Sequence, residues 1–183
     1  MTIFLIFAVG CRQDMHDQPK YEPLEASTFF EDGRSSRPLV PDTVARGHLQ
    51  ADEHLYTGKS GKAHASTFPF PVTREIFERG KERYNIFCSP CHDRVGTGQG
   101  MVVRRGYTRP SSFHTDRLRQ APVGYFFDAM TNGFGVMPDY AAQVAVRDRW
   151  AIVAYIRALQ LSQRATVADV PAEGRSQLLG TEQ

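Results

Sequence analysis

Apolar side chains recur at three- and four-residue intervals in the second half of the chain, a spacing that is typical of amphipathic helices. The clearest run starts after the helix start signals Pro71 and Thr73 and continues to Cys88. A second helix is predicted over Asp148–Gln160, where apolar residues lie on most sides, so that two of its faces must be covered. A shorter helix is expected over Val123–Thr131, before an Asn-Gly stop. The pattern therefore predicts an all-α domain.

Residues 12–70 show neither helical nor strand periodicity and are rich in Pro, Gly, Ser, Asp and Glu. They carry seven basic and nine acidic side chains, and apolar residues recur among them. A flexible linker is one interpretation. A disordered tether rarely contains so many apolar side chains, so we favour an extended arm that becomes ordered across partner subunits. With Cys11 included, the predicted arm comprises residues 11–70.

The first ten residues form an apolar run that ends in small residues before Cys11, as in an export signal that is removed. The run is too short to span a bilayer. Ala8-Val9-Gly10-Cys11 resembles the lipobox of bacterial lipoproteins, in which the cysteine thiol receives a lipid. We therefore expect lipidation at Cys11, which would anchor the protein to a membrane. The expected location is the periplasm or the outer face of the bacterial cytoplasmic membrane. The alternative is an unmodified thiol.

Composition limits the possible architectures. With 183 residues, 41% hydrophobic and 23% charged, the chain has room for one ordinary domain and a long appendage. We place the domain at residues 71–162 and a C-terminal tail at residues 163–183. A net charge of +2 is too small to indicate nucleic acid as a partner. Three cysteines exclude a disulfide framework.

Cys88-Ser89-Pro90-Cys91-His92 is the C-x-x-C-H pattern of c-type haem attachment. Two thiols at this spacing can each add across a vinyl group of one porphyrin, and the histidine then becomes an axial ligand of the iron. A zinc site would need further ligands at suitable spacing. A thioredoxin-like dithiol would need a strand that the flanking sequence does not predict. The motif predicts one covalently bound haem c.

The sixth iron ligand has four candidates, Met101, Met130, Met137 and His114. Met137 is preferred because it lies in a glycine-rich loop before Pro138, which favours an extended backbone at the methionine. A thioether opposite histidine raises the reduction potential. With both axial positions occupied, no small substrate binds the iron, so we expect an electron carrier and not an enzyme.

Six arginines and one acid occur between residues 94 and 119. Among them, Arg104 and Arg105 are our candidates for contacts with the haem propionates, or with an acidic docking partner. The alternative is a solvated loop. The other ring nitrogen of His92 needs an acceptor, for which a carbonyl around Pro110 is the candidate.

Taken together, CSPCH, the helix with Gly80 and Tyr84, the Met-Pro loop and the helix with Trp150 and Tyr155 resemble a class I cytochrome c. The resemblance covers residues 71–162. It implies that the first and last helices cross beside the haem, with Gly80 and Tyr155 at the crossing. It also implies that the carbonyl of Pro110 accepts the hydrogen bond from the axial histidine.

A narrower resemblance extends over most of the chain. Its segments are QDMHDQPKYEPLE, SSRPLVPDTVARG, RYNIFCSPCHDRVGTGQGMVVRRG, NGFGVMPDY and DRWAIVAYIRALQLSQ. Together they are similar to the mono-haem cytochrome c component of bacterial alternative complex III. This similarity implies an electron-transfer subunit of a quinol-oxidising respiratory membrane complex that also contains a multi-haem cytochrome. It would pass single electrons to a terminal oxidase or a soluble carrier. An independent periplasmic electron shuttle is the alternative.

Overall fold

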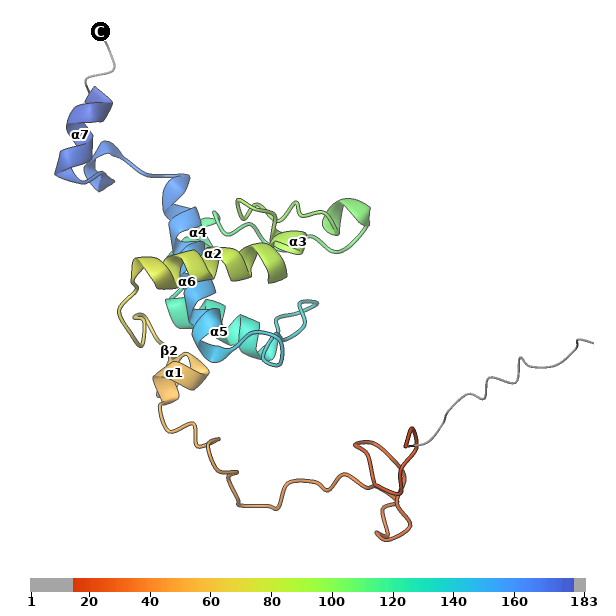
Figure 1. Ribbon diagram of the computed structural model, residues 1–183. Helices are drawn as coiled ribbons and strands as arrows, with labels where there is room; N and C mark the ends of the chain where they lie inside the picture. Colours follow the sequence, from red (N-terminus) through yellow and green to blue (C-terminus); the bar gives the residue numbers. More distant parts are fainter. Residues whose placement is uncertain (1–14, 180–183) are drawn as a thin grey trace, which may run out of the picture. The chain divides into compact units, whose positions relative to one another are not determined.

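The structure is a computed structural model that describes residues 15–179. It divides into two compact units, one that ends at Leu49 and one that begins at Gln50. The elements of the second unit are α1 (Glu53–Thr57), β1 (Lys59–Ser60), β2 (Ala63–His64), α2 (Arg74–Phe87), α3 (Ser89–His92), η1 (Val103–Arg105), α4 (Asp116–Gln120), α5 (Val123–Asn132), α6 (Val146–Ser162), η2 (Val167–Asp169) and α7 (Ala172–Leu179) (Figure 1). Helices dominate, and β1 and β2 form only a short antiparallel hairpin. The predicted fold class is confirmed.

The three helices predicted from periodicity are all present. α2 begins after Thr73, whose side chain caps the helix by accepting a hydrogen bond from the Ile76 amide. α5 extends one residue beyond its predicted end, and α6 is slightly longer at both ends than its apolar pattern indicated. The terminal residues of a helix have weaker sequence signals than its packed face, which explains these small differences.

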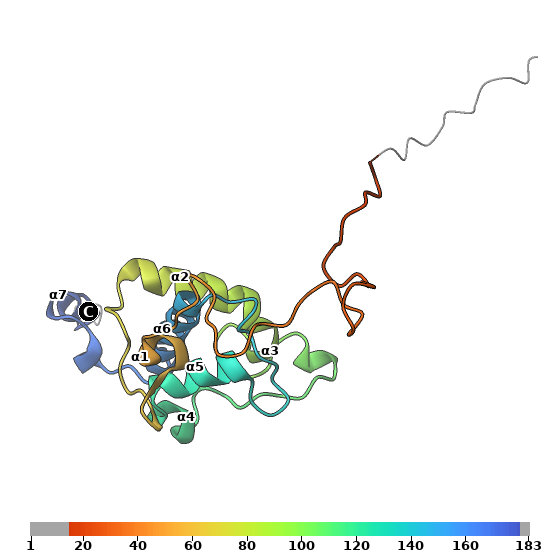
Figure 2. The same cartoon turned by 90° about the horizontal axis from the view of Figure 1, so that it is seen from below.

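α2 crosses α6 at close range (Figures 1 and 2). The approach requires a glycine, since a Cβ at Gly80 would lie 2.0 Å from the carbonyl oxygen of Ala151. Beside this contact, the ring of Tyr155 lies 5.6 Å from that of Phe77 and 5.2 Å from that of Tyr84. The expected crossing is present, although Gly80 meets backbone and Tyr155 meets two other aromatic rings.

The core lies between α2, α5 and α6. Trp150 of α6 is completely buried and stacks on Phe127 of α5 with ring centroids 4.5 Å apart. Ile152 and Val153, on other sides of α6, are also completely buried. α6 is therefore covered on more than one face, as its apolar pattern predicted.

Residues 50–70, which we call the strap, supply part of that cover. The indole nitrogen of Trp150 donates a 2.8 Å hydrogen bond to the carbonyl of Leu55. The amide of Gly124 donates to the carbonyl of Ala65, and a Cβ at Gly124 would lie 2.0 Å from the carbonyl oxygen of Gly58. The second compact unit thus begins with the strap, at Gln50, whereas the sequence pattern placed the start of the domain at Pro71.

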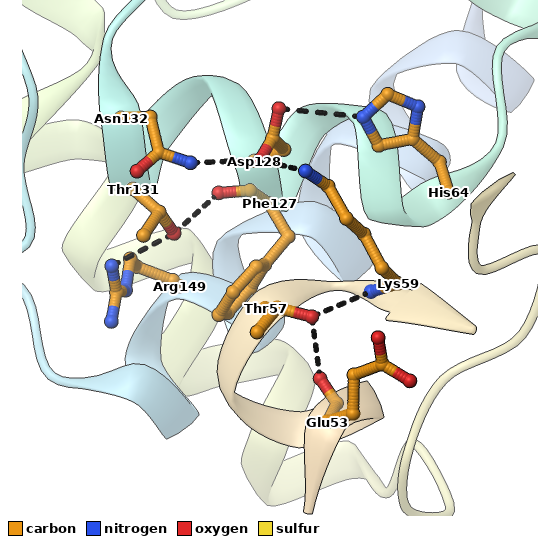
Figure 3. A network of polar contacts seen from close by, with 9 residues as sticks. All are labelled: Glu53, Thr57, Lys59, His64, Phe127, Asp128, Thr131, Asn132 and Arg149. Atoms are coloured by element: carbon orange, nitrogen blue, oxygen red, sulfur yellow. Dashed lines mark hydrogen bonds and ion pairs between the residues drawn. The ribbon is translucent and has the colours of Figure 1, made fainter. Parts of the chain in front are cut away.

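Polar contacts complete the attachment of the strap to α5 (Figure 3). The carboxylate of Asp128 lies 3.6 Å from Nζ of Lys59 and 3.3 Å from Nε2 of His64. At the end of the same helix, Thr131 accepts a 2.8 Å hydrogen bond from the buried guanidinium of Arg149 on α6. The strap, α5 and α6 are therefore linked by hydrogen bonds and ion pairs as well as by apolar packing.

Residues 15–49, which we call the outer arm, contain no helix or strand and are held by turns and local side-chain contacts, such as the guanidinium of Arg37 over the ring of Phe30. An isolated bridge pairs Ala26 with Arg34, and the amide of Ser27 donates to the carbonyl of Gly33. Large apolar side chains of the outer arm are mostly exposed: Met15, Tyr21, Leu24, Phe29, Leu39, Val40, Val44 and Leu49. Within the described part of the chain, no helix is long and apolar enough to cross a membrane.

Candidate haem-binding site

The C-x-x-C-H motif lies on one short helical turn. α2 ends at Phe87, and Cys88 leads directly into α3. The amide of His92 donates a 2.9 Å hydrogen bond to the carbonyl of Cys88, which closes the turn. Pro90, near the start of α3, has no amide hydrogen to leave unpaired. Because one turn carries the side chains of Cys88, Cys91 and His92, all three line the same cavity.

The cavity has a volume of about 350 Å³ and is lined mainly by apolar atoms. Met137 and Pro138 line it together with the motif. Burial raises the pKa of the Cys88 thiol to about 12, and the neighbouring Cys91 adds to this effect. An apolar cavity with two thiols on one turn matches the needs of a porphyrin attached through two thioethers.

His92 presents a neutral imidazole. Burial lowers its pKa to about 4, although the charge of Asp93 acts in the opposite direction. Neutral imidazole is the form that binds a metal ion. Nδ1 is buried and has no hydrogen-bond partner, so the expected bond to the carbonyl of Pro110 is not made, although Pro110 lines the cavity. Instead, the His92 ring stacks on that of Phe113, with centroids 4.5 Å apart and planes at 9°.

Asp93 organises the loop that follows the motif. Its carboxylate accepts hydrogen bonds from the amides of Val95, Gly96, Thr97 and Gln99. Burial acts to raise the pKa of Asp93, but the hydrogen bonds outweigh it and hold the pKa at about 2. The backbone of Asp93 has φ 59° and ψ 176°, a conformation that usually requires glycine and costs about 1–3 kcal/mol. The carboxylate contacts offset this cost.

The Met137 loop is a tight turn. Phe134 and Met137 exchange two backbone hydrogen bonds of 3.0 Å across it, and Gly135 has φ 60° between them. Tyr140 then donates from its amide to the carbonyl of Met130 in α5. The turn leaves the Met137 side chain against the core and on the cavity wall, and leaves Val136 exposed.

The other candidates for the sixth ligand lie elsewhere. Met101 is 59% exposed and does not line the cavity. Met130 is buried in the core on α5. Nε2 of His114 makes a 2.6 Å hydrogen bond to the carbonyl of Val95, so this nitrogen is engaged. Of the four candidates, Met137 alone reaches the cavity.

The structure brings other arginines to the cavity than those chosen from the sequence. Arg109 and Arg117 line it, and Nη1 of Arg117 donates to the hydroxyl of Tyr125. Arg104 and Arg105 lie exposed on η1 and are not among the lining residues. A segment rich in arginines predicts positive charge close to the cavity. Which of these arginines lines the cavity depends on the path of the loop.

Sequence reasoning also missed the aromatic wall of the cavity. It consists of Phe87, Tyr107, Tyr125, Phe126, Phe134 and Tyr140. A partial signal was present, since the predicted middle helix contains Tyr125 and Phe126 side by side and the methionine loop contains Phe134 and Tyr140. Their periodicity indicated packing but could not distinguish a cavity wall from the core.

The family described as "Cytochrome C oxidase, cbb3-type, subunit III" matches residues 75–156. This part of the chain is a cytochrome c domain. The domain binds haem c covalently, which confirms the predicted cofactor, and its function is electron transfer. Cytochrome c domains typically work outside the cytoplasm.

Three solved structures illustrate the similarity. A reducing HAO-like protein complex of Kuenenia stuttgartiensis is 21% identical, with 58% of this chain and 54% of that chain covered and a TM-score of 0.43. Cytochrome cL of Hyphomicrobium denitrificans is 17% identical, with coverages of 55% and 57% and a TM-score of 0.37. Cytochrome cL of Methylophaga aminisulfidivorans is 15% identical, with coverages of 65% and 90% and a TM-score of 0.41. The alignment thus spans little more than half the length of the first two chains. The search of curated proteins found no match.

Proposed function

We propose that this cytochrome c is the electron-transfer subunit of a quinol-oxidising respiratory membrane complex, similar to the mono-haem cytochrome c component of alternative complex III. The outer arm is the observation that carries the proposal. It places large apolar side chains in solvent, with Leu24 95% exposed and Leu39 86% exposed. A shuttle that diffuses alone has no need of such a segment, whereas a bound subunit buries it against its partners.

The haem is attached through Cys88 and Cys91 and ligated by His92 and Met137. Two observations support this set: the four side chains line one cavity, and the competing methionines and His114 do not. When bound, haem c supplies a single centre that accepts and releases one electron. The protein contributes a neutral imidazole, a thioether that favours the reduced state, and an apolar wall that limits water.

Electrons enter and leave where the cavity meets the surface. Tyr107, Phe134 and Val136 line the cavity and are 48%, 59% and 65% exposed, so an apolar surface surrounds its mouth. The hydroxyl of Tyr107 donates to the carbonyl of Val136, which ties two sides of this surface together. Arg109 adds positive charge beside it, which suits an acidic partner. The donor is a multi-haem subunit of the complex, and the acceptor is a terminal oxidase or a soluble carrier.

Cys11 lies outside the described residues, and its lipidation remains a prediction from the sequence. A lipid at this position would hold the outer arm near the membrane surface and the partner subunits. It agrees with a site of action at the outer face of the cytoplasmic membrane.

Purification from native membranes in mild detergent tests the proposal. We expect haem-stained fractions to contain this chain together with a quinol-oxidising assembly and a multi-haem cytochrome, identified by mass spectrometry. Mass analysis of the N-terminal peptide would report lipid on Cys11. Recovery of the whole pool as a free protein in the periplasmic fraction would instead support an independent shuttle.

Ligation is tested separately by Met137→Ala. Loss of the thioether should open the sixth position, lower the reduction potential and allow carbon monoxide to bind the ferrous protein. Met101→Ala, at an exposed methionine, is the matched control and should leave all three properties unchanged. An unaltered spectrum in Met137→Ala would contradict the assignment.

A further inference from the structure

Phe113 lies behind the proposed axial ligand. Its ring is nearly parallel to that of His92, with centroids 4.5 Å apart, and it is only 7% exposed. Phe113 does not line the cavity, whereas His92 does. The phenyl ring therefore covers the imidazole from the protein side.

A parallel ring at this distance restricts the imidazole. Rotation of His92 about its Cβ–Cγ bond would drive an edge of the imidazole into the phenyl face. The torsion about that bond has broad minima in histidine, so the side chain does not define its own ring plane. The usual restraint is a hydrogen bond at the second ring nitrogen. Here Nδ1 makes none, and the stack is the contact that defines the plane.

Phe113 is itself held from both sides. Its amide donates a 2.9 Å hydrogen bond to the carbonyl of Gly96, in the loop organised by Asp93. Its carbonyl accepts a 2.8 Å hydrogen bond from Nε2 of Gln160, a side chain of α6 that is only 6% exposed. The backbone position of Phe113 therefore depends on a loop next to the motif and on the last helix of the core.

The amide of Gln160 has a defined orientation. Its oxygen accepts a 2.7 Å hydrogen bond from Nη1 of Arg157, and a guanidinium can only donate. The Nε2 group must therefore face the two carbonyls of Phe113 and Leu118. Arg157 is fixed in turn by the carbonyls of Arg119 and Ala121. This network satisfies the buried polar groups of the segment that carries Phe113.

We propose that Phe113, held in place by Gln160, is a positioning residue that sets the plane of the His92 imidazole. The inference rests on the proposed axial role of His92, since it concerns how that ligand is oriented. The plane of an axial imidazole determines its overlap with the iron orbitals. Phe113 would thus influence the g values and the reduction potential of the haem through His92, without direct contact with the haem.

Electron paramagnetic resonance of the ferric holoprotein tests this, because the g values of low-spin haem respond to the axial ligand planes. Phe113→Leu should shift the largest g value and the reduction potential, and Phe113→Tyr, which keeps the ring, should restore both. Phe127→Leu is the matched control, since Phe127 is completely buried but stacks on Trp150. It should lower the melting temperature while leaving both haem properties at wild-type values.

Wild-type g values in Phe113→Leu, or an equal shift in Phe127→Leu, would overturn the proposal. If Phe113→Leu does not retain haem, Gln160→Met decides, because it removes the hydrogen bonds from Gln160 to the carbonyls of Phe113 and Leu118 but keeps the phenyl ring. A shifted g value in Gln160→Met supports the proposal, and an unchanged one refutes it. Failure of the axial assignment is distinguishable, since the wild-type protein itself would then lack the low-spin signal of His–Met ligation.

Discussion

The outer arm and the strap have the same kind of sequence and different structures. Both contain Gly, Ser and charged residues and neither has a helical or strand period, although only one proline, Pro69, lies in the strap. In the outer arm most of the large apolar side chains are exposed, whereas Leu55, Phe68 and Phe70 of the strap pack against the core. An irregular segment can therefore be part of a domain when it packs on the core. Here the strap contacts the indole of Trp150 and Gly124 of α5.

Deletion of the strap together with the residues before it should have the largest effect on the stability of the haem domain. Deletion of residues 1–49 should leave the thermal midpoint of the haem domain within about 2 °C of that of the full chain. Deletion of residues 1–70 uncovers Trp150 and the face of α5, so we expect a loss of several kcal/mol and a decrease of about 10 °C or more. Thermal unfolding followed by circular dichroism measures both. Equal midpoints would show that the strap contributes nothing.

The next largest loss of stability is expected from Gly124→Ala, which adds a methyl group where α5 contacts the strap. Gly124→Ala places a Cβ 2.0 Å from the carbonyl oxygen of Gly58, so the strap must shift, at a cost of about 3 kcal/mol. In the outer arm, a Cβ at Gly47 meets nothing within 4 Å. Gly47→Ala should leave unfolding of the haem domain unchanged. Chemical denaturation of the two variants measures the difference, and similar midpoints would contradict it.

Trp150→Phe removes one hydrogen bond between the strap and the core together with part of a buried ring. The variant leaves the carbonyl of Leu55 without the indole donor and creates a small cavity, for a loss of about 2 kcal/mol. Tyr21→Phe, at a 64% exposed ring of the outer arm, is the control and should have no effect. Urea unfolding at 25 °C distinguishes the two variants. A wild-type midpoint for Trp150→Phe would show that the bond is not needed.

The smallest expected effect is on the pH dependence of stability, and it concerns a pair of residues within the haem domain. Arg79 of α2 donates two hydrogen bonds, of 2.9 and 2.7 Å, to the carboxylate of Asp148 on α6. The hydrogen bonds from Arg79 lower the pKa of Asp148 below its ordinary value of 3.8. The resulting stability is therefore fully present above pH 3.8 and is lost as the pH falls further.

Asp148→Asn should remove that part of the acid dependence. Melting temperatures of the variant and the wild type should differ at pH 7 and converge as the pH falls below 3.8. Asp52→Asn, at the cap of α1, changes a carboxylate that does not pair with Arg79 and serves as the control. A constant difference between Asp148→Asn and the wild type across the series would contradict the assignment.

The positions of the main helices and the haem motif were predictable because both depend on local spacing. A three-and-four period forms one apolar face wherever it occurs, and two thiols separated by two residues lie on one turn. The same local reasoning found the Met137 loop, whose glycines and proline restrict the backbone directly. These predictions needed no knowledge of which elements come together.

Other features were not predictable for a common reason. The choice of Arg109 and Arg117 over Arg104 and Arg105 depends on where a long loop turns. The stack of Phe113 on His92 joins residues from segments that approach only after folding. Asp93 occupies a backbone conformation that usually needs glycine, and only the amides of the folded loop make this tolerable.

The cofactor, its covalent attachment and the helical class of the domain could be predicted from the amino-acid sequence, since each follows from residue type and short-range periodicity. Which irregular residues pack on the domain, which arginines line the cavity and which ring lies behind His92 became known only from the folded structure. These outcomes depend on contacts between residues far apart in the chain. Such contacts are selected by the packing of the whole core, which no local pattern encodes.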